Sequence, residues 1–150
     1  MTSIPQFSLE LDAQLCFALY STSLAMTKTY KPMLDKVGLT YPQYLTMLVL
    51  WESDGLTVKQ MAERLSLDSA TMTPLLKRLE TQGYVKRVRG VEDERQVYIH
   101  LTDAGRELKK AIRDIPGVIY CAAGSDADRL IKLRDDLVRL RASLIEYNET

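Results

Sequence analysis

The sequence holds few of the residues that build metal, cofactor and disulfide sites. Its 150 residues include two cysteines, one histidine and one tryptophan. Cys16 and Cys121 stand far apart, and there is neither a CxxC pair nor a cluster of cysteine and histidine, which argues against a disulfide scaffold or a zinc site. We therefore expect no metal ion and no cofactor, and we expect His100 to face solvent.

Long apolar runs are also lacking. Each hydrophobic stretch is too short and too interrupted to span a bilayer. Residues 1–15 have neither the basic region nor the cleavage site of a signal peptide. These features predict a cytoplasmic protein without membrane contact. In that reducing compartment a disulfide would act as a signal, not as a permanent cross-link.

The sequence does have long stretches of helical periodicity. Residues 9–30 contain no glycine or proline and predict a long helix that ends before Pro32. Residues 32–36 predict a short second helix, which Gly38 stops. The chain is thus expected to be mainly helical from its start.

Several further helices begin at capping signals. Thr40 and Thr57 each precede a glutamine by three positions, the spacing of a capping box. Asp68 or Ser69 caps the helix that follows. Pro74 lies inside that helix and favours a late or loose start, because proline removes a backbone donor.

After Gly83 the pattern changes from helix to strand. Val97, Ile99 and Leu101 alternate with polar residues, as expected for a half-buried strand. Together with the rougher run at residues 84–90, this strand predicts a β-hairpin.

The C-terminal third returns to helix. Thr102 caps one helix, Pro116–Gly117 interrupts it, and Ser125 with Asp128 caps the last. The last helix carries a narrow leucine seam, which can pack on its own domain or on a partner subunit. The apolar first helix could join it, which favours the partner. The seam consists of Leu130, Leu133, Leu137, Leu140 and Leu144.

Basic residues gather in one region although the formal net charge is zero. Between residues 69 and 89 the only acidic side chain is Glu80. Helices at 57–66 and 69–82, followed by the hairpin, form the order of a winged helix–turn–helix. A helical domain with an ordinary exposed hairpin is the alternative. The basic side chains of this region are Lys77, Arg78, Lys86, Arg87 and Arg89.

In a winged helix the helix at 69–82 would lie in the major groove of DNA. Its short polar side chains could reach base edges or phosphates, and those side chains are Ser69, Thr71 and Thr73. Lys77 and Arg78 would reach backbone oxygens. At the hairpin tip Arg95 would enter the minor groove, and Asp93 would orient an arginine.

The stretch "TVKQMAERLSLDSATMTPLLKRLETQGYVKRVRGVEDERQVYIHLTDAG" resembles the winged-helix core of the MarR family of bacterial regulators. The resemblance implies one MarR-like domain over residues 1–150, mainly α-helical with a small β-hairpin wing. The DNA-binding core would span about residues 40–106, and residues 1–39 and 107–150 would form a helical dimerisation region. It also implies a homodimer that binds a near-palindromic, double-stranded operator DNA, usually as a repressor.

The stretches "QLCFALYS" and "TKTYKPMLDKVGLTYPQYL" resemble the organic hydroperoxide-sensing OhrR branch of that family. This resemblance implies that an organic hydroperoxide is the inducer and that Cys16 is the reactive residue. Tyr30 and Tyr41 would hydrogen-bond its thiolate, with Tyr20 nearby. Cys121 matches the two-cysteine type, in which the second cysteine, from the other subunit, forms a disulfide with the oxidised one.

Residue chemistry by itself leaves the role of Cys16 open. A free cysteine in an apolar helix is more often a small core hydrophobe than a sensor. Two rivals stay open as well: a MarR-type regulator that responds to a non-oxidising aromatic ligand, and a thiol peroxidase. The chain lacks the alternating strands and helices of thioredoxin-like peroxidases, so we do not expect an enzyme.

Overall fold

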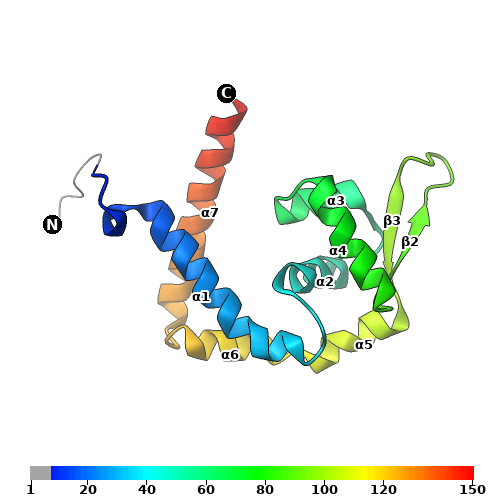
Figure 1. Cartoon of the computed structure of the whole chain (residues 1–150), viewed down its shortest axis with the longest axis horizontal. Coiled ribbons are helices and arrows are strands. Elements are labelled where there is room, and N and C mark those ends of the chain that lie inside the picture. Colours follow the sequence, from blue (N-terminus) through cyan, green and yellow to red (C-terminus); the bar gives the residue numbers. More distant parts are fainter. Residues whose placement is uncertain (1–7) are drawn as a thin grey trace. The chain divides into compact units, whose positions relative to one another are not determined.

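The computed structural model describes residues 8–150, which are the coloured part of Figure 1. The chain divides into two compact units, residues 1–113 and 114–150. The expectation of no signal peptide concerns residues 1–7 in part, and these lie outside the described residues. Within residues 8–150 no helix is long and apolar enough to cross a membrane.

The first helix differs from its prediction at both ends. A short 3₁₀ turn, Leu11–Ala13, precedes α1, which spans Leu15–Asp35. The helix passes through Pro32, so the expected break and the separate helix at 32–36 are wrong. Pro32 lies in the last turn, where a missing N–H removes one intrahelical bond shortly before the helix ends.

Gly38 then stops the helix as expected. Its φ of 70° is left-handed, and the N–H of Leu39 donates to the carbonyl of Leu34 at 3.1 Å. This is the hydrogen bond of a Schellman motif.

Both predicted capping boxes are confirmed. Thr40 begins α2, Tyr41–Glu52, and Thr57 begins α3, Val58–Leu65. In each box the threonine hydroxyl accepts the glutamine N–H, and the glutamine side chain accepts the threonine N–H. Two donors at each helix start are thereby satisfied by residues three positions apart.

The next helix, α4, spans Ser69–Thr81 and begins without delay. The Asp68 carboxylate accepts the N–H of Thr71 at 2.7 Å and fixes the start. The expected late or loose start is therefore wrong. Pro74 leaves the Ala70 carbonyl without its helical donor, but both residues are exposed, so water can replace the lost bond.

The predicted hairpin is confirmed as β2, Val85–Arg89, and β3, Val97–Leu101. A third strand, β1, Leu56–Thr57, pairs with the other edge of β3, giving the antiparallel order β1-β3-β2. Two residues are too few to show alternation, so the sequence did not predict β1. His100, expected to face solvent, is partly exposed and lies beside Gly55.

The core of the first unit joins α2, α3, α4 and the sheet. Burying each large side chain contributes about 1.5–3 kcal/mol. The most deeply buried include Met47, Leu50, Met61, Met72, Leu76, Leu79 and Ile99, none more than 1% exposed.

Thr102 caps α5, Asp103–Ala111, as predicted, and accepts the N–H of Gly105 at 3.0 Å. The indole N–H of Trp51 donates to the Gly105 carbonyl at 3.0 Å. A Cβ on Gly105 would lie 2.1 Å from the carbonyl oxygen of Tyr84. Close approach of α5 to the strand therefore requires glycine at this position.

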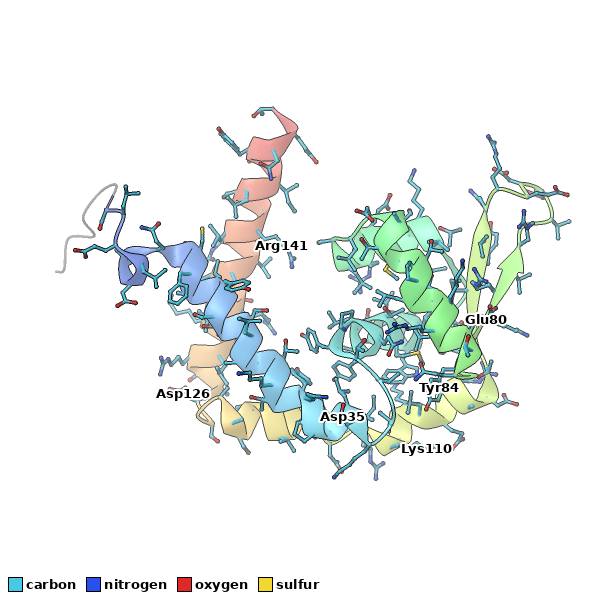
Figure 2. All side chains as sticks on the ribbon, in the orientation of Figure 1. Asp35, Glu80, Tyr84, Lys110, Asp126 and Arg141 are labelled. Atoms are coloured by element: carbon cyan, nitrogen blue, oxygen red, sulfur yellow. The ribbon has the colours of Figure 1, made fainter. Side chains whose placement is uncertain are left out.

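The second unit consists of α6, Ile115–Ala122, and α7, Ala127–Glu149. Asp126, labelled in Figure 2, caps α7 by accepting the N–H of Arg129 at 3.2 Å. The prediction of Ser125 with Asp128 is thus one residue early, because Ser125 takes a left-handed φ of 60° and belongs to the turn. Along α7 the seam leucines are exposed or half-buried, and the helix has no buried residue.

Candidate nucleic-acid interface and redox site

The recognition helix predicted from the sequence, α4, has one buried side and one open side. Met72, Leu76 and Leu79 face the core. On the rest of the helix surface Ser69, Thr71, Lys77 and Arg78 are exposed, and Thr73 is half-buried. The Thr73 hydroxyl donates to the Ser69 carbonyl at 2.9 Å, so its oxygen remains free to accept a hydrogen bond.

Positive charge on α4 is not neutralised within the described chain. No ion pair found among residues 8–150 involves Lys77 or Arg78. Glu80, at the C-terminal part of α4 in Figure 2, instead pairs with Arg87 of β2 at 3.1 Å. Two unpaired cations thus lie on the helix surface that a nucleic acid could approach.

The tip of the hairpin holds its arginine in place. One Asp93 oxygen, Oδ1, accepts from the backbone N–H of Arg95 at 3.0 Å and from its Nε at 3.2 Å. The Arg95 side chain is nevertheless 92% exposed. Asp93 orients Arg95, as expected, while leaving most of the guanidinium open.

Two hydrogen bonds connect the loop that follows α1 with the residues that follow α4. The Gln82 side-chain amide donates to the Gly38 carbonyl at 2.6 Å. The Tyr84 hydroxyl donates to the Val37 carbonyl at 3.3 Å. The helix that carries Cys16 and the candidate recognition helix therefore belong to one compact unit, and the segments that follow them are hydrogen-bonded to each other.

Both cysteines are exposed. Cys16 lies in the first turn of α1 and Cys121 near the end of α6. Core filling therefore does not explain Cys16 in this chain. Tyr20, four residues along α1, is 65% exposed, and Phe17 and Leu19 are half-buried. The residues beside Cys16 along α1 thus form an open and largely apolar surface.

The rings of Tyr30 and Tyr41, the two residues that the family resemblance assigns to the thiolate, contact each other, and the ring of Tyr44 contacts both. Ring centroids lie 4.8 Å apart for Tyr30 and Tyr41, and 5.5 Å apart for Tyr30 and Tyr44. Burial, with added repulsion from the two neighbouring tyrosines, raises the pKa of Tyr30 to about 12. Burial also raises the pKa of Tyr41 and Tyr44. All three hydroxyls thus stay protonated near neutral pH and can donate hydrogen bonds.

This tyrosine cluster, defined as Tyr30, Tyr41 and Tyr44, does not reach Cys16 of the same chain. Tyr30 follows Cys16 by 14 residues (30 − 16) on the continuous helix α1, a distance of about 21 Å. Tyr44 carried no sequence signal beyond helical periodicity, so sequence reasoning missed it. Among the described residues no group of histidine, cysteine and carboxylates could hold a metal ion.

Comparison with known proteins gives consistent matches. Residues 28–112 match the family described as transcriptional regulator SarA/Rot. The chain is 50% identical, over 93% of its length and 95% of the relative, to the organic hydroperoxide resistance transcriptional regulator of Bacillus subtilis (strain 168).

Solved structures of AbfR of Staphylococcus epidermidis are also similar. Reduced AbfR bound to DNA is 36% identical, with a TM-score of 0.78 over 90% of this chain and 94% of that one. Disulfide-formed AbfR is 34% identical, with a TM-score of 0.64 over the whole of both chains. The mainly helical winged-helix fold is thereby confirmed.

Proposed function

Because the chain belongs to the SarA/Rot family of transcriptional regulators and has the winged-helix fold of MarR-type regulators, we propose that it is a redox-sensing repressor. A homodimer binds operator DNA while Cys16 is reduced, and an organic hydroperoxide releases it. One observation carries the proposal: within the single chain Cys16 is not packed in a core but lies on the open, largely apolar surface of α1, where a second copy can complete a site around it. The relative named for organic hydroperoxide resistance supports the choice of oxidant.

DNA binding in this proposal uses the open side of α4. Ser69, Thr71 and Thr73 approach bases or phosphates in the major groove, and the unpaired Lys77 and Arg78 contact backbone oxygens. Arg95, oriented by Asp93, enters the minor groove. The relative AbfR, which was solved bound to DNA, supports this use of the fold.

The homodimer covers apolar surface that a single chain leaves open. In α7 Leu133 and Leu144 are 50% and 53% exposed, and in α1 Leu15 and Leu24 are 58% and 51% exposed. A second copy would bury both helices. Residues 1–39 and 107–150 are therefore proposed as the dimerisation region, with residues 40–106 as the DNA-binding core.

The dimer also brings the tyrosine hydroxyls to the sulfur. Because Tyr30 lies about 21 Å from Cys16 on the same rigid helix, the hydroxyls of Tyr30 and Tyr41 reach Cys16 only from the partner subunit. Their donated hydrogen bonds stabilise a thiolate without supplying a positive charge. Tyr20, on the same side of α1 as Cys16, borders the site.

Oxidation then proceeds in two balanced steps. The Cys16 thiolate attacks the outer oxygen of the hydroperoxide, the O–O bond breaks, and the alkoxide leaves and takes a proton, so Cys16 becomes a sulfenic acid. The Cys121 thiol of the partner subunit attacks that sulfur, and water leaves as the disulfide forms. The two thiols lose two electrons to the peroxide.

Disulfide formation requires the two Cα atoms to come within about 7 Å. The helix movement that this demands shifts the two recognition helices from the spacing of about 34–36 Å that successive major grooves impose. The protein leaves the operator and transcription begins.

The test combines DNA binding with mass analysis. Fluorescence anisotropy on DNA selected from a random library should show that one equivalent of organic hydroperoxide releases the native protein. Cys16→Ser should bind as the native protein does and stay bound. Native protein should also form a covalent dimer that a thiol reductant reverses, and Cys121→Ser should not. Release of the Cys16→Ser protein by peroxide would contradict the proposal and favour a non-oxidising ligand.

A further inference from the structure

The first unit contains a pocket that the proposed redox switch does not use. It has a volume of about 370 Å³ and lies between the start of α2 and the C-terminal half of α4. Its walls come from the α1–α2 loop, the first turn of α2 and the last two turns of α4. The hydrogen bond from Gln82 to the Gly38 carbonyl closes one side.

Gln43 is the buried polar group of this pocket. It lines the pocket, yet the residue is only 2% exposed. Its Oε1 accepts the N–H of Thr40 at 2.9 Å, completing the capping box. Among the hydrogen bonds of residues 8–150, its Nε2 donates none. Because no fully buried side-chain nitrogen or oxygen of the described residues lacks a partner, the Nε2 of Gln43 must be open to the pocket, where it can donate to a ligand.

The other polar residues of the pocket are two cations and the neutral Thr40, Thr81 and Gln82. Lys77 and Arg78 line it, and no carboxylate does. Neither cation takes part in an ion pair within the described chain. The start of α2, a helix of 12 residues, adds the positive end of its dipole at the rim. The pocket thus combines donors with uncompensated positive charge, the chemistry that suits an oxyanion.

We propose that this pocket binds a phosphate group, held by the Gln43 amide, Lys77 and Arg78. The phosphate belongs either to the DNA backbone beside α4 or to a free phosphate ester. The first source rests on the proposed DNA-binding function, and the second does not. Gln43 is then a phosphate-positioning residue. The sequence marked it only as the capping-box partner of Thr40, and no motif indicated this second role.

A sharp variant is Gln43→Glu. A glutamate at this position keeps the capping-box acceptor for the Thr40 N–H, but it replaces the donor in the pocket with a negative charge. Gln60→Glu is the matched control, since Gln60 occupies the same place in the capping box of α3 and is exposed outside the pocket. Thr81→Asp, at an exposed lining residue, is a second variant that leaves the buried site intact.

Two measurements separate the sources. The first is the thermal midpoint in inorganic phosphate against chloride at equal ionic strength. The second is DNA affinity across salt concentrations. If the source is DNA, Gln43→Glu and Thr81→Asp weaken binding about tenfold and reduce the salt slope by about one phosphate contact, while Gln60→Glu matches the native protein.

If the source is a free phosphate, inorganic phosphate raises the midpoint of the native and Gln60→Glu proteins only, and the DNA slope stays the same in all variants. If the native protein binds DNA, the salt slope is the same in all variants, and phosphate raises the thermal midpoint of the native protein no more than that of the two pocket variants, the phosphate pocket is overturned but the DNA-binding function is not. A native protein that binds no DNA would overturn that function, and the phosphate arm would still decide the pocket.

Discussion

Tyr30 and Cys16 lie on one helix, yet α1 keeps them about 21 Å apart. Family resemblance placed the tyrosines with the cysteine from the sequence, but it did not show which copy of the chain supplies them. The continuous helix limits the answer, since no rotamer of either side chain spans that distance. Each sensing site therefore needs two chains under the proposed function.

Two heterodimers of identical composition test this arrangement. One pairs Cys16→Ser with Tyr30→Phe chains, and the other pairs a native chain with the Cys16→Ser/Tyr30→Phe double variant. Sulfenic acid trapping should show that Cys16 in the second pair reacts about tenfold more slowly, because a hydrogen bond to a charged group contributes about 1.5–3 kcal/mol. The reverse order of rates would place the hydroxyl in the same chain.

Asp68 links the start of the recognition helix to pH. The N–H of Thr71, followed by its hydroxyl, hydrogen-bonds the carboxylate and lowers the pKa of Asp68. A lowered folded-state pKa stabilises the fold above the unfolded pKa of about 4, and this stabilisation is lost as pH falls through the folded pKa.

Asp68→Asn keeps a good N-cap acceptor but cannot titrate. We expect the thermal midpoint to fall less between pH 7 and pH 3 in this variant than in the native protein. Both proteins share all other carboxylates, so the contributions of those groups to the fall in thermal midpoint cancel in the comparison. Equal losses in the two proteins would exclude Asp68 as a source of acid sensitivity.

At the scale of elements, signals within a few residues of each other were readable from the sequence. The capping boxes at Thr40 and Thr57 are such signals, because both partners lie within one turn. The strand β1 was not readable, since two residues gain their strand geometry only by pairing with β3. Local hydrogen bonds that periodicity does not reveal form the turn before α7: the Ser125 N–H donates to the Tyr120 carbonyl, and the Tyr120 hydroxyl donates to the Ser125 carbonyl.

Close packing of α5 on the strand gives an element-scale prediction. Gly105→Ala should destabilise the fold by about 2–3 kcal/mol, because its Cβ would meet the Tyr84 backbone at 2.1 Å. Gly117→Ala in α6 is the control: nothing lies within 4 Å of its Cβ, so alanine should stabilise that helix by about 0.5–1 kcal/mol. Urea unfolding measures both. A neutral Gly105→Ala would show that α5 can move away from the strand.

At the scale of the whole molecule, α7 exposes more apolar surface than the leucine seam alone. Ile131, Val138 and Ile145 recur every seven residues and are 43–48% exposed. Sequence periodicity found the seam, but no pattern within one chain states what covers it. The surface of α7 is thus a part of this protein that sequence reasoning leaves open and that a second copy would complete.

Leu137→Glu tests that second copy. A charge in the middle of the seam should convert the dimer to monomers in sedimentation velocity and lower DNA affinity by more than tenfold, because one recognition helix then binds alone. Ser143→Glu adds the same charge to the exposed polar side of α7 and should change neither measurement. If the Leu137→Glu protein is still a dimer, the interface does not lie at the leucine seam.

The hydrogen bonds from Gln82 to Gly38 and from Tyr84 to Val37 link the loop after α1 to the residues after α4. The 21 residues of α1 extend about 31 Å, with the Cys16 sulfur near one end and this linked loop just beyond the other. A tilt of about 6° of a helix this long moves its far end by about 3 Å, close to the 3.4 Å rise of one base pair. Under the proposed function, a small tilt of α1 caused by one disulfide bond would thus suffice to move the recognition helix out of register with the major groove.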